Sequence, residues 1–172
     1  MANRAYLYIS DNPEEWDFDI DAYPYYDSRH YFPVIWWLLF NPEDVKLVNC
    51  LYNGASWKEI KLVAEKSKAL SSLDTRLEKH RDKISQFIDY ELIEQFCFNI
   101  REWSGNYLLV DLSEIIEEEA EYLLPQITDF LFSIDSNLDL KNIPSDMTGS
   151  LYSDRSEVNS IGYTYSKSDV KT

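Results

Sequence analysis

An acid- and tyrosine-rich stretch near the N-terminus, residues 11–26, has the residue types closest to a recognisable site. Its aspartates at positions 17, 19 and 21 have the spacing of the first ligands of a calcium-binding loop. That loop is incomplete, because Ala22 stands where the sharp turn requires glycine and Ser28 stands where a bidentate glutamate belongs. We therefore interpret the stretch as a protein-contact surface, since tyrosine offers large contact area at low entropic cost. The alternative is that the rings cover the core. The predicted contact residues are Asp17, Asp19, Asp21, Tyr23 and Tyr25.

A second acidic cluster follows Ser113, which has the residue type of a helix N-cap. Acidic side chains near a helix N-terminus interact favourably with the helix dipole, and this accounts for Glu114. The density of glutamates that follows exceeds what the dipole requires, so we interpret it as a second contact surface. Pro125 is predicted to end or kink this helix. The predicted contact residues here are Glu117, Glu118 and Glu121.

Residues for catalysis, metal binding or cofactor binding are sparse. The four glycines form no phosphate loop, dinucleotide fingerprint or nucleophile elbow. The histidines are His30 and His80, and the two cysteines, Cys50 and Cys97, lie in apolar surroundings without zinc-site spacing. We therefore predict a protein without catalytic residues, cofactor or metal. A hydrolase that uses buried carboxylates is the enzymatic alternative, and it requires carboxyl groups with shifted pKa values.

The charge of the chain limits its partners. Thirty-one acidic residues against sixteen lysines and arginines give a formal net charge of −15. Such a field repels nucleic acid and anionic membranes and attracts cationic proteins. The N-terminus has no apolar signal-peptide region, and no stretch is apolar enough to span a bilayer. We therefore predict a cytoplasmic protein that binds neither nucleic acid nor membrane.

The most hydrophobic stretch, Phe32–Phe40, is apolar except for Pro33. Burying a large apolar side chain is worth roughly 1.5–3 kcal/mol, so this stretch is predicted to dominate the core. Residues 5–9 and 107–112 have the apolar and aromatic composition of buried strands. Together these features predict one α+β domain, residues 1–142, with a small β-sheet packed against several α-helices.

The spacing of apolar residues predicts the helices of this domain. The longest, residues 57–90, has a predicted break near Ser71–Ser72 and a solvated, mixed-charge face that includes Arg76 and His80. Asn53–Gly54 is interpreted as the end of the preceding helix. The predicted helices are residues 34–40 (with a buried strand as the alternative), 42–51, 57–90, 91–103 and the segment from 114 onward.

The composition of the chain changes at residue 143. Ser, Asp, Thr and Gly dominate from there on, as in a linker or tail, so we assign residues 143–172 to a C-terminal segment. Within it, residues 161–165 alternate in the manner of a strand and are predicted to add one to the sheet.

Three stretches resemble a family of small bacterial proteins. They are residues 1–8, which read MANRAYLY, the apolar run after a proline at 32–41, and residues 109–115, which read LVDLSEI. These stretches are similar to immunity proteins of polymorphic-toxin and contact-dependent-inhibition loci. The resemblance implies that the chain binds the C-terminal domain of one cognate toxin and blocks its active site.

Charge and resemblance together predict an immunity protein that binds a cationic, nuclease-type toxin domain. An acidic inhibitor can compete with nucleic acid for a cationic cleft. The alternative is an acidic adaptor or structural protein without catalytic activity, for which a homodimer is one form.

Overall fold

One antiparallel sheet of six strands organises the part of the chain that the computed structural model describes, which is residues 4–14, 24–29, 32–86, 88–112, 120–144 and 163–165. The strand order is β3-β4-β5-β1-β2-β6, and helices pack on the sheet, so the predicted α+β class is confirmed. The strands are β1 (Arg4–Ser10), β2 (Tyr25–Arg29), β3 (Val45–Tyr52), β4 (Ala55–Glu65), β5 (Tyr107–Asp111) and β6 (Tyr163–Tyr165). The helices are α1 (Val34–Trp37), α2 (Lys66–Ile84), α3 (Tyr90–Glu102) and α4 (Ala120–Ile134), with the 3₁₀ turns η1 (Pro42–Asp44) and η2 (Leu140–Asn142).

The two strands predicted from the most apolar segments are neighbours within the sheet. β1 pairs with β5, so that Tyr8 lies opposite Leu109. Side chains alternate along β1, and Tyr8 on one face and Leu7 on the other are both buried, as expected of a central strand. The predicted C-terminal strand is also present, because β6 pairs with β2 at the edge of the sheet.

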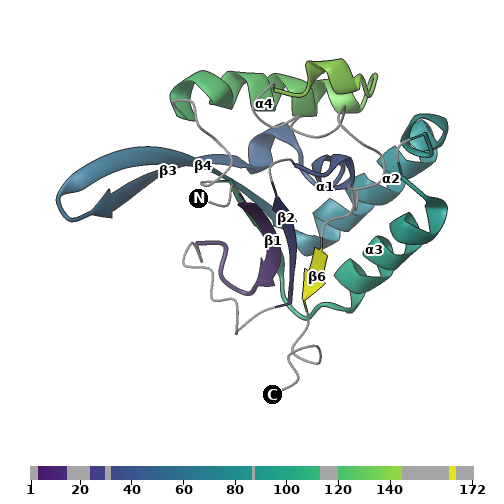
Figure 1. The fold of residues 1–172 in the computed structure, drawn as a ribbon, viewed down its shortest axis with the longest axis horizontal. Helices are drawn as coiled ribbons and strands as arrows, with labels where there is room; N and C mark the ends of the chain where they lie inside the picture. Colours follow the sequence, from purple (N-terminus) through teal and green to yellow (C-terminus); the bar gives the residue numbers. More distant parts are fainter. Residues whose placement is uncertain are drawn as a thin grey trace.

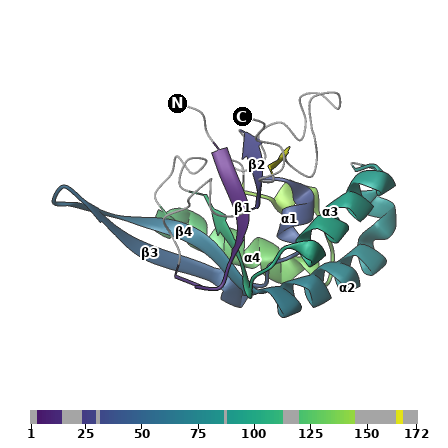
Figure 2. The same ribbon diagram turned by 90° about the horizontal axis from the view of Figure 1, so that it is seen from below.

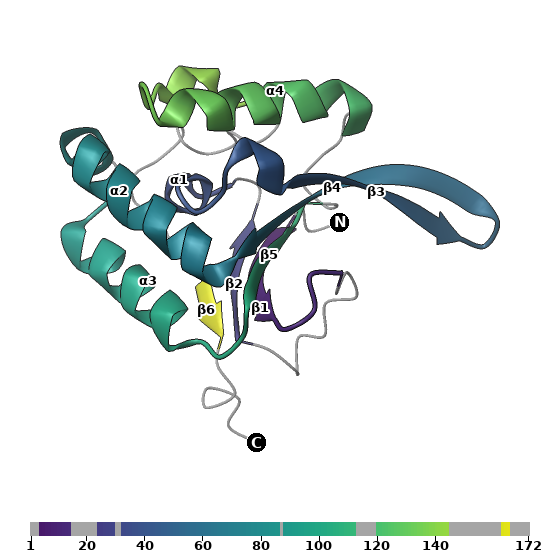
Figure 3. The same ribbon diagram turned by 180° about the vertical axis from the view of Figure 1, so that it is seen from behind.

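The described helices cover one face of the sheet, and the β3–β4 hairpin projects beyond it (Figure 1). Figure 2 shows α2 and α3 together on the side of the molecule away from this hairpin, and Figure 3 shows α4 above the start of the hairpin. Phe96 of α3 and Trp103, which directly follows α3, pack on Tyr26 of β2 with ring centroids 5.1 and 5.3 Å away. Burial raises the pKa of Tyr26 to about 12, so the phenol is neutral. Its oxygen accepts a hydrogen bond from Asn99 Nδ2 at 2.9 Å.

The stretch Phe32–Phe40 lies in the core, as its composition predicts. Every residue in it is buried, and Trp36 and Trp37 have no exposed surface. Only Val34–Trp37 form a helical turn, and the chain then continues with hydrogen bonds between residues three apart, such as Leu39 N–H to the carbonyl of Trp36 at 3.1 Å. This short helix leaves buried carbonyl groups at its end, and these need donors from elsewhere in the chain.

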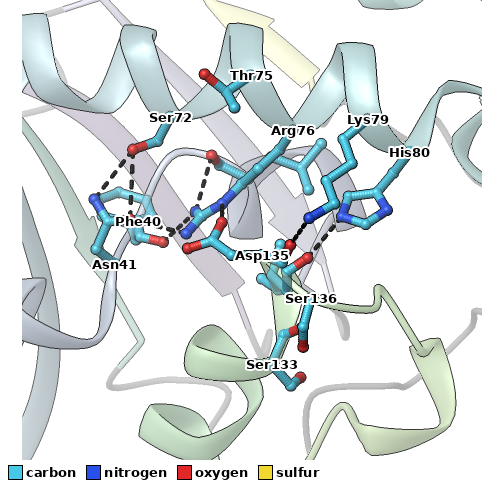
Figure 4. A network of polar contacts seen from close by, with 12 residues as sticks. Phe40, Asn41, Ser72, Thr75, Arg76, Lys79, His80, Ser133, Asp135 and Ser136 are labelled. Carbon is cyan, nitrogen blue, oxygen red and sulfur yellow. Dashed lines mark hydrogen bonds and ion pairs between the residues drawn. The ribbon is translucent and has the colours of Figure 1, made fainter.

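Arg76 of α2 supplies those donors (Figure 4). Its side chain is only 2% exposed, and Nη1 donates to the carbonyl oxygens of Leu38 at 3.2 Å and Phe40 at 2.6 Å. Nη2 donates to Asn41 Oδ1 at 2.8 Å, and Nε donates to Asp135 Oδ1 at 2.7 Å. The hydrogen bond from Arg76 lowers the pKa of Asp135. These five residues, the Arg76 cluster, join the core stretch, α2 and the end of α4.

Further basic side chains of α2 cap the C-terminal end of α4. Lys79 Nζ donates a hydrogen bond to the carbonyl of Asp135. His80 Nε2 lies 2.6 Å from the carbonyl oxygen of Ile134 and is the donor of that bond, because a carbonyl oxygen only accepts hydrogen bonds. Cationic and N–H groups at a helix C-terminus stabilise its unpaired carbonyls. The prediction that Arg76 and His80 lie on a solvated face is therefore wrong: they are 1% and 6% exposed.

The helices predicted at residues 42–51 and at the start of 57–90 are strands. β3 and β4 form a hairpin whose turn is Asn53–Gly54, with φ of 49° and 81°. Positive φ at both positions defines the two-residue turn that matches the twist of paired strands. Asn53–Gly54 is thus a hairpin turn rather than a helix end, and the β-branched Val48 and Ile60 on either side favour strands.

The remaining helix predictions have mixed outcomes. α3 confirms the helix predicted at 91–103. α2 continues through Ser71–Ser72, and its non-helical residue is His80. α4 is not ended by Pro125, which lies inside it. Ile143, just beyond the predicted boundary at 142, is buried in the main core.

Replacing Arg76 with methionine is expected to lower the free energy of unfolding by roughly 2–6 kcal/mol, because two buried carbonyls each lose a donor at about 1–3 kcal/mol. Lys68→Met is the matched control, since it removes a cation of the same helix whose ion pair with Glu65 is exposed, and it should cost far less. Urea denaturation measures both. An equal loss in free energy of unfolding in both variants would show that the buried guanidinium of Arg76 does not stabilise the fold more than an exposed cation does.

Gly105 precedes β5 with φ of 150°, and a Cβ there would lie 2.6 Å from Ile9 Cγ1. Gly105→Ala is expected to cost about 2–4 kcal/mol from backbone strain and overlap. Gly54→Ala is the control, since its φ is also positive at 81° but no atom lies within 4 Å of the added Cβ. It should cost only about 1 kcal/mol. Thermal denaturation compares them, and a similar loss in both variants would contradict a role for the Ile9 contact.

Candidate functional site

The sheet face opposite the helices carries a row of charged side chains. Lys61 of β4 lies beside Asp111 of β5 in the strand register. Asp111 in turn lies beside Tyr6 of β1, and Tyr6 lies beside Asp27 of β2. Arg4 Nη1 donates to Asp27 Oδ2 at 2.9 Å. Because side chains alternate along strands, these residues share one face. We call the following set the charged row: Arg4, Asp27, Glu59, Lys61 and Asp111.

Lys61 lies between two carboxylates at the centre of this row. Its Nζ is 2.6 Å from Asp111 Oδ1 and 3.0 Å from Glu59 Oε2, and its side chain is 4% exposed. Glu59 also accepts a hydrogen bond from Trp57 Nε1 at 2.6 Å. The ammonium group is thus held by carboxylates that come from two neighbouring strands.

These contacts determine the ionisation of Lys61, Glu59 and the neighbouring thiol of Cys50. Burial disfavours the charge on Lys61, but Asp111 and Glu59 outweigh burial and raise the pKa of Lys61. Burial also disfavours the charge on Glu59, yet hydrogen bonds from Trp57 and Lys61 lower the pKa of Glu59. Burial and the neighbouring Glu59 raise the pKa of the Cys50 thiol. At neutral pH these groups are an ammonium, a carboxylate and a protonated thiol, and none is poised for proton transfer or nucleophilic attack.

The same face also holds a small aromatic cluster. Tyr8, Tyr25, Val63 and Leu109 are buried together, and the rings of Tyr6 and Tyr25 meet edge-on with centroids 6.0 Å apart. Tyr25 is only 5% exposed. Its predicted role as a contact residue is therefore corrected, because the ring covers the sheet instead of facing a partner.

Glu121 is the other predicted contact residue that the structure describes. Its side chain is exposed in the first turn of α4 and forms an ion pair with Lys58 of β4. The predicted contact residues that lie outside the described residues are Asp17, Asp19, Asp21, Tyr23, Glu117 and Glu118.

The acidic segments 15–23 and 113–119 are attached at opposite ends of paired strands. The first lies between Ser10, at the end of β1, and Tyr25, at the start of β2. The second follows Leu112, just after the end of β5, and β5 runs antiparallel to β1. Their points of attachment therefore do not bring the two predicted contact surfaces together.

The β3–β4 hairpin is a projecting element with exposed apolar side chains, which we call the arm and define as residues 45–58. It projects from the body of the molecule (Figures 1 and 2). Leu51 is 77% exposed and Trp57 is 43% exposed. Large exposed apolar side chains on one element are typical of interaction sites. Sequence reasoning missed the arm, although Asn53–Gly54 between two apolar runs is a strong hairpin signal.

A groove of about 660 Å³ lies between α2 and α3. Leu77 and Cys97 line it, and burial raises the pKa of the Cys97 thiol, which is therefore protonated. Arg81 stacks on Tyr90 at 5.1 Å, and Arg101 pairs with an aspartate of α2 at 2.5 Å. The groove thus contains no activated nucleophile. Among the residues that the structure describes, no three or more His, Cys, Asp or Glu residues are grouped so as to hold a metal ion.

Comparisons with protein-family models, curated proteins and solved structures find no match for this chain. The resemblance to immunity proteins therefore stays a prediction. None of the helices in the described ranges combines the length and apolarity that crossing a bilayer requires.

Lys61→Met is expected to lower the free energy of unfolding by about 2 kcal/mol, less than the 3–5 kcal/mol of a fully buried pair because both carboxylates retain some exposure. The difference in free energy of unfolding between wild type and Lys61→Met should shrink as the pH falls below 4.5, the ordinary pKa of Glu59. The pKa of Glu59 is lowered in the fold, so this carboxyl stabilises the fold only while it is ionised. The same difference should shrink above pH 10.5, the ordinary pKa of Lys61. There the pH approaches and passes the raised pKa that Lys61 has in the fold, and its ammonium group loses its charge.

Denaturant titrations from acid to alkaline pH measure this difference. Lys58→Met is the control, because Lys58 forms an exposed ion pair with Glu121 and should cost less than about 1 kcal/mol. A pH-independent difference between wild type and Lys61→Met would contradict the assignment of the stabilisation to these charges.

Proposed function

We propose that this chain is an immunity protein, a non-catalytic binding protein that neutralises a cognate cationic toxin domain by covering its active site. The distribution of negative charge is the observation that carries the proposal. Segments 15–23 and 113–119 carry eight acidic residues and no basic residue, which is more than half of the net charge of −15. Concentrated charge of one sign accelerates and selects the binding of an oppositely charged partner.

The ion pairs of the described residues support this proposal. Lys61, Arg76 and Arg101 each pair with a carboxylate of the described body. Their positive charge is thus compensated locally and does not offset the acidic residues of the two segments. The lowered pKa of Glu59 and the raised pKa of Lys61 also favour binding over catalysis at these two residues, because a general acid or base needs a pKa close to the working pH.

The test is binding to the C-terminal domain of the protein encoded immediately upstream, measured by calorimetry over a series of salt concentrations. We expect a one-to-one complex whose affinity falls as salt rises, because exposed charges are screened. Co-expression should also restore growth that this domain alone inhibits. Absence of binding to a harmless neighbour would overturn the proposal and leave the adaptor alternative.

Changing Asp17, Asp19 and Asp21 together to lysine should weaken this complex by roughly tenfold or more, equivalent to about 1.4 kcal/mol, and flatten its salt dependence. The control makes the same change in charge at exposed acids of α2, α3 and α4 and should leave affinity nearly unchanged. If both triple variants lose affinity equally, net charge rather than this segment governs binding. The control positions are Asp82, Glu94 and Asp129.

A further inference from the structure

The groove between α2 and α3 has an apolar floor and exposed aromatic rings. Figures 2 and 3 show the two helices side by side. Ile84, Ile93 and Cys97 line the groove and are buried. Tyr90 and Phe98 also line it, and they are 53% and 64% exposed. Exposed rings beside an apolar floor are typical of a binding surface, whereas the outer face of a solvated helix is polar.

The charged side chains at the two ends of this groove have partners within it. Asp74 of α2 pairs with Arg101 of α3 at 2.5 Å, and Arg81 of α2 lies 5.1 Å from the ring centre of Tyr90 in α3. These contacts show that α2 and α3 run antiparallel. The lining residues on the α2 side extend from Asp74 to Ser85, which is about 16 Å or three helical turns.

Two carboxylates face each other between these ends. Glu78 and Glu94 both line the groove, and the antiparallel register places them opposite each other near its middle. Both side chains are exposed, and among the described residues neither has a hydrogen bond or an ion pair. Like charges placed opposite each other repel, so a cation brought between them is favoured.

We propose that this groove binds an amphipathic helix of a partner protein, one with an apolar stripe about three turns long and a lysine or arginine on either side of its middle. The stripe covers the floor of the groove, and the two cations pair with Glu78 and Glu94. Charge selects this occupant over a second copy, because the chain has a net charge of −15 and the middle of the groove has only carboxylates to offer.

The shape of the groove favours a helix over a small molecule. Its volume of about 660 Å³ lies in the range of small-molecule pockets, roughly 300–1,000 Å³, but such pockets enclose most of their ligand. Here Glu78 and Arg81 on one side and Glu94 and Phe98 on the other are exposed, so the groove is open to solvent along its length. A helix fits an open groove because it buries one face and leaves the other in water.

Calorimetry of the full chain with a designed peptide tests the proposal. The probe is an acetylated, amidated, alanine-rich peptide of about four turns, with leucines at i, i+3, i+7 and i+10 and one lysine on either side of this stripe at its middle. We expect one peptide per chain and an affinity roughly tenfold or more above that of a peptide with the same residues in scrambled order. A smaller difference would overturn the proposal. Equal affinity for phenethylamine, which has a ring and a cation but no helix, would also overturn it.

A matched pair of charge variants locates the cation contacts. Glu78→Gln combined with Glu94→Gln should weaken peptide binding by roughly tenfold or more. Asp82→Asn combined with Glu91→Gln removes two exposed charges from the same helices outside the groove, and it should leave the affinity nearly unchanged. An equal loss in both double variants would show that net charge governs binding and would overturn the proposal.

A second pair of variants locates the apolar contact. Phe98→Ala should weaken peptide binding by roughly tenfold, because the ring lines the groove. Phe132→Ala, at a residue of α4 that is 76% exposed, should not weaken it. Equal affinities of the two variants would place the peptide elsewhere and would overturn the proposal.

A second copy and the toxin domain are the other occupants to distinguish. In light scattering, a wild-type dimer that Phe98→Lys converts to a monomer would show that a second copy fills the groove. Competition between the toxin domain and the peptide would show that the toxin fills it. Either result would overturn the assignment to a separate partner. The toxin-binding proposal is tested independently, since none of these changes lies in segments 15–23 or 113–119.

Discussion

The buried backbone of Phe32–Phe40 is the constraint on which the rest of the structure depends. Its side chains supply apolar surface to the core, but its short helix leaves carbonyl groups without partners inside the chain segment itself. Arg76 satisfies them, and a buried guanidinium is stable only when its donors are also paired. α2 and the end of α4 must therefore be placed together around this stretch, and the sheet lies against the layer that they form.

The two faces of the sheet carry different kinds of side chain. The helical face is apolar and contributes to the main core, whereas the opposite face combines aromatic rings with the charged row. Lys61 holds carboxylates from two strands, so the charges on that face stabilise strand pairing. The acidic segments and the cationic arm then have opposite electrostatic character.

Several parts of the fold could be predicted because their signals are local. The apolar run at Phe32–Phe40, the strands around Tyr8 and Leu109, and α3 each have a composition or period that suits one kind of structure. The spacing of apolar residues alone could not distinguish the β3–β4 hairpin from a helix. Ile60, Val63 and Ala64 fit helical spacing. In β4 they are buried on opposite faces, because Ile60 and Ala64 lie in the main core and Val63 lies in the aromatic cluster. The turn at Asn53–Gly54 was the local feature that distinguished the two.

The sequence by itself determined the net charge, the apolar stretch that enters the core, the central strands and the scarcity of catalytic groups, because these depend on composition and short-range pattern. Only the tertiary structure decided that Arg76 and Lys61 are buried and paired, that Tyr25 is inaccessible, and that β3 is the terminal strand of the sheet among the described residues. The physical reason is that a polar or aromatic side chain is buried only where distant segments supply its partners, and no local pattern encodes those partners.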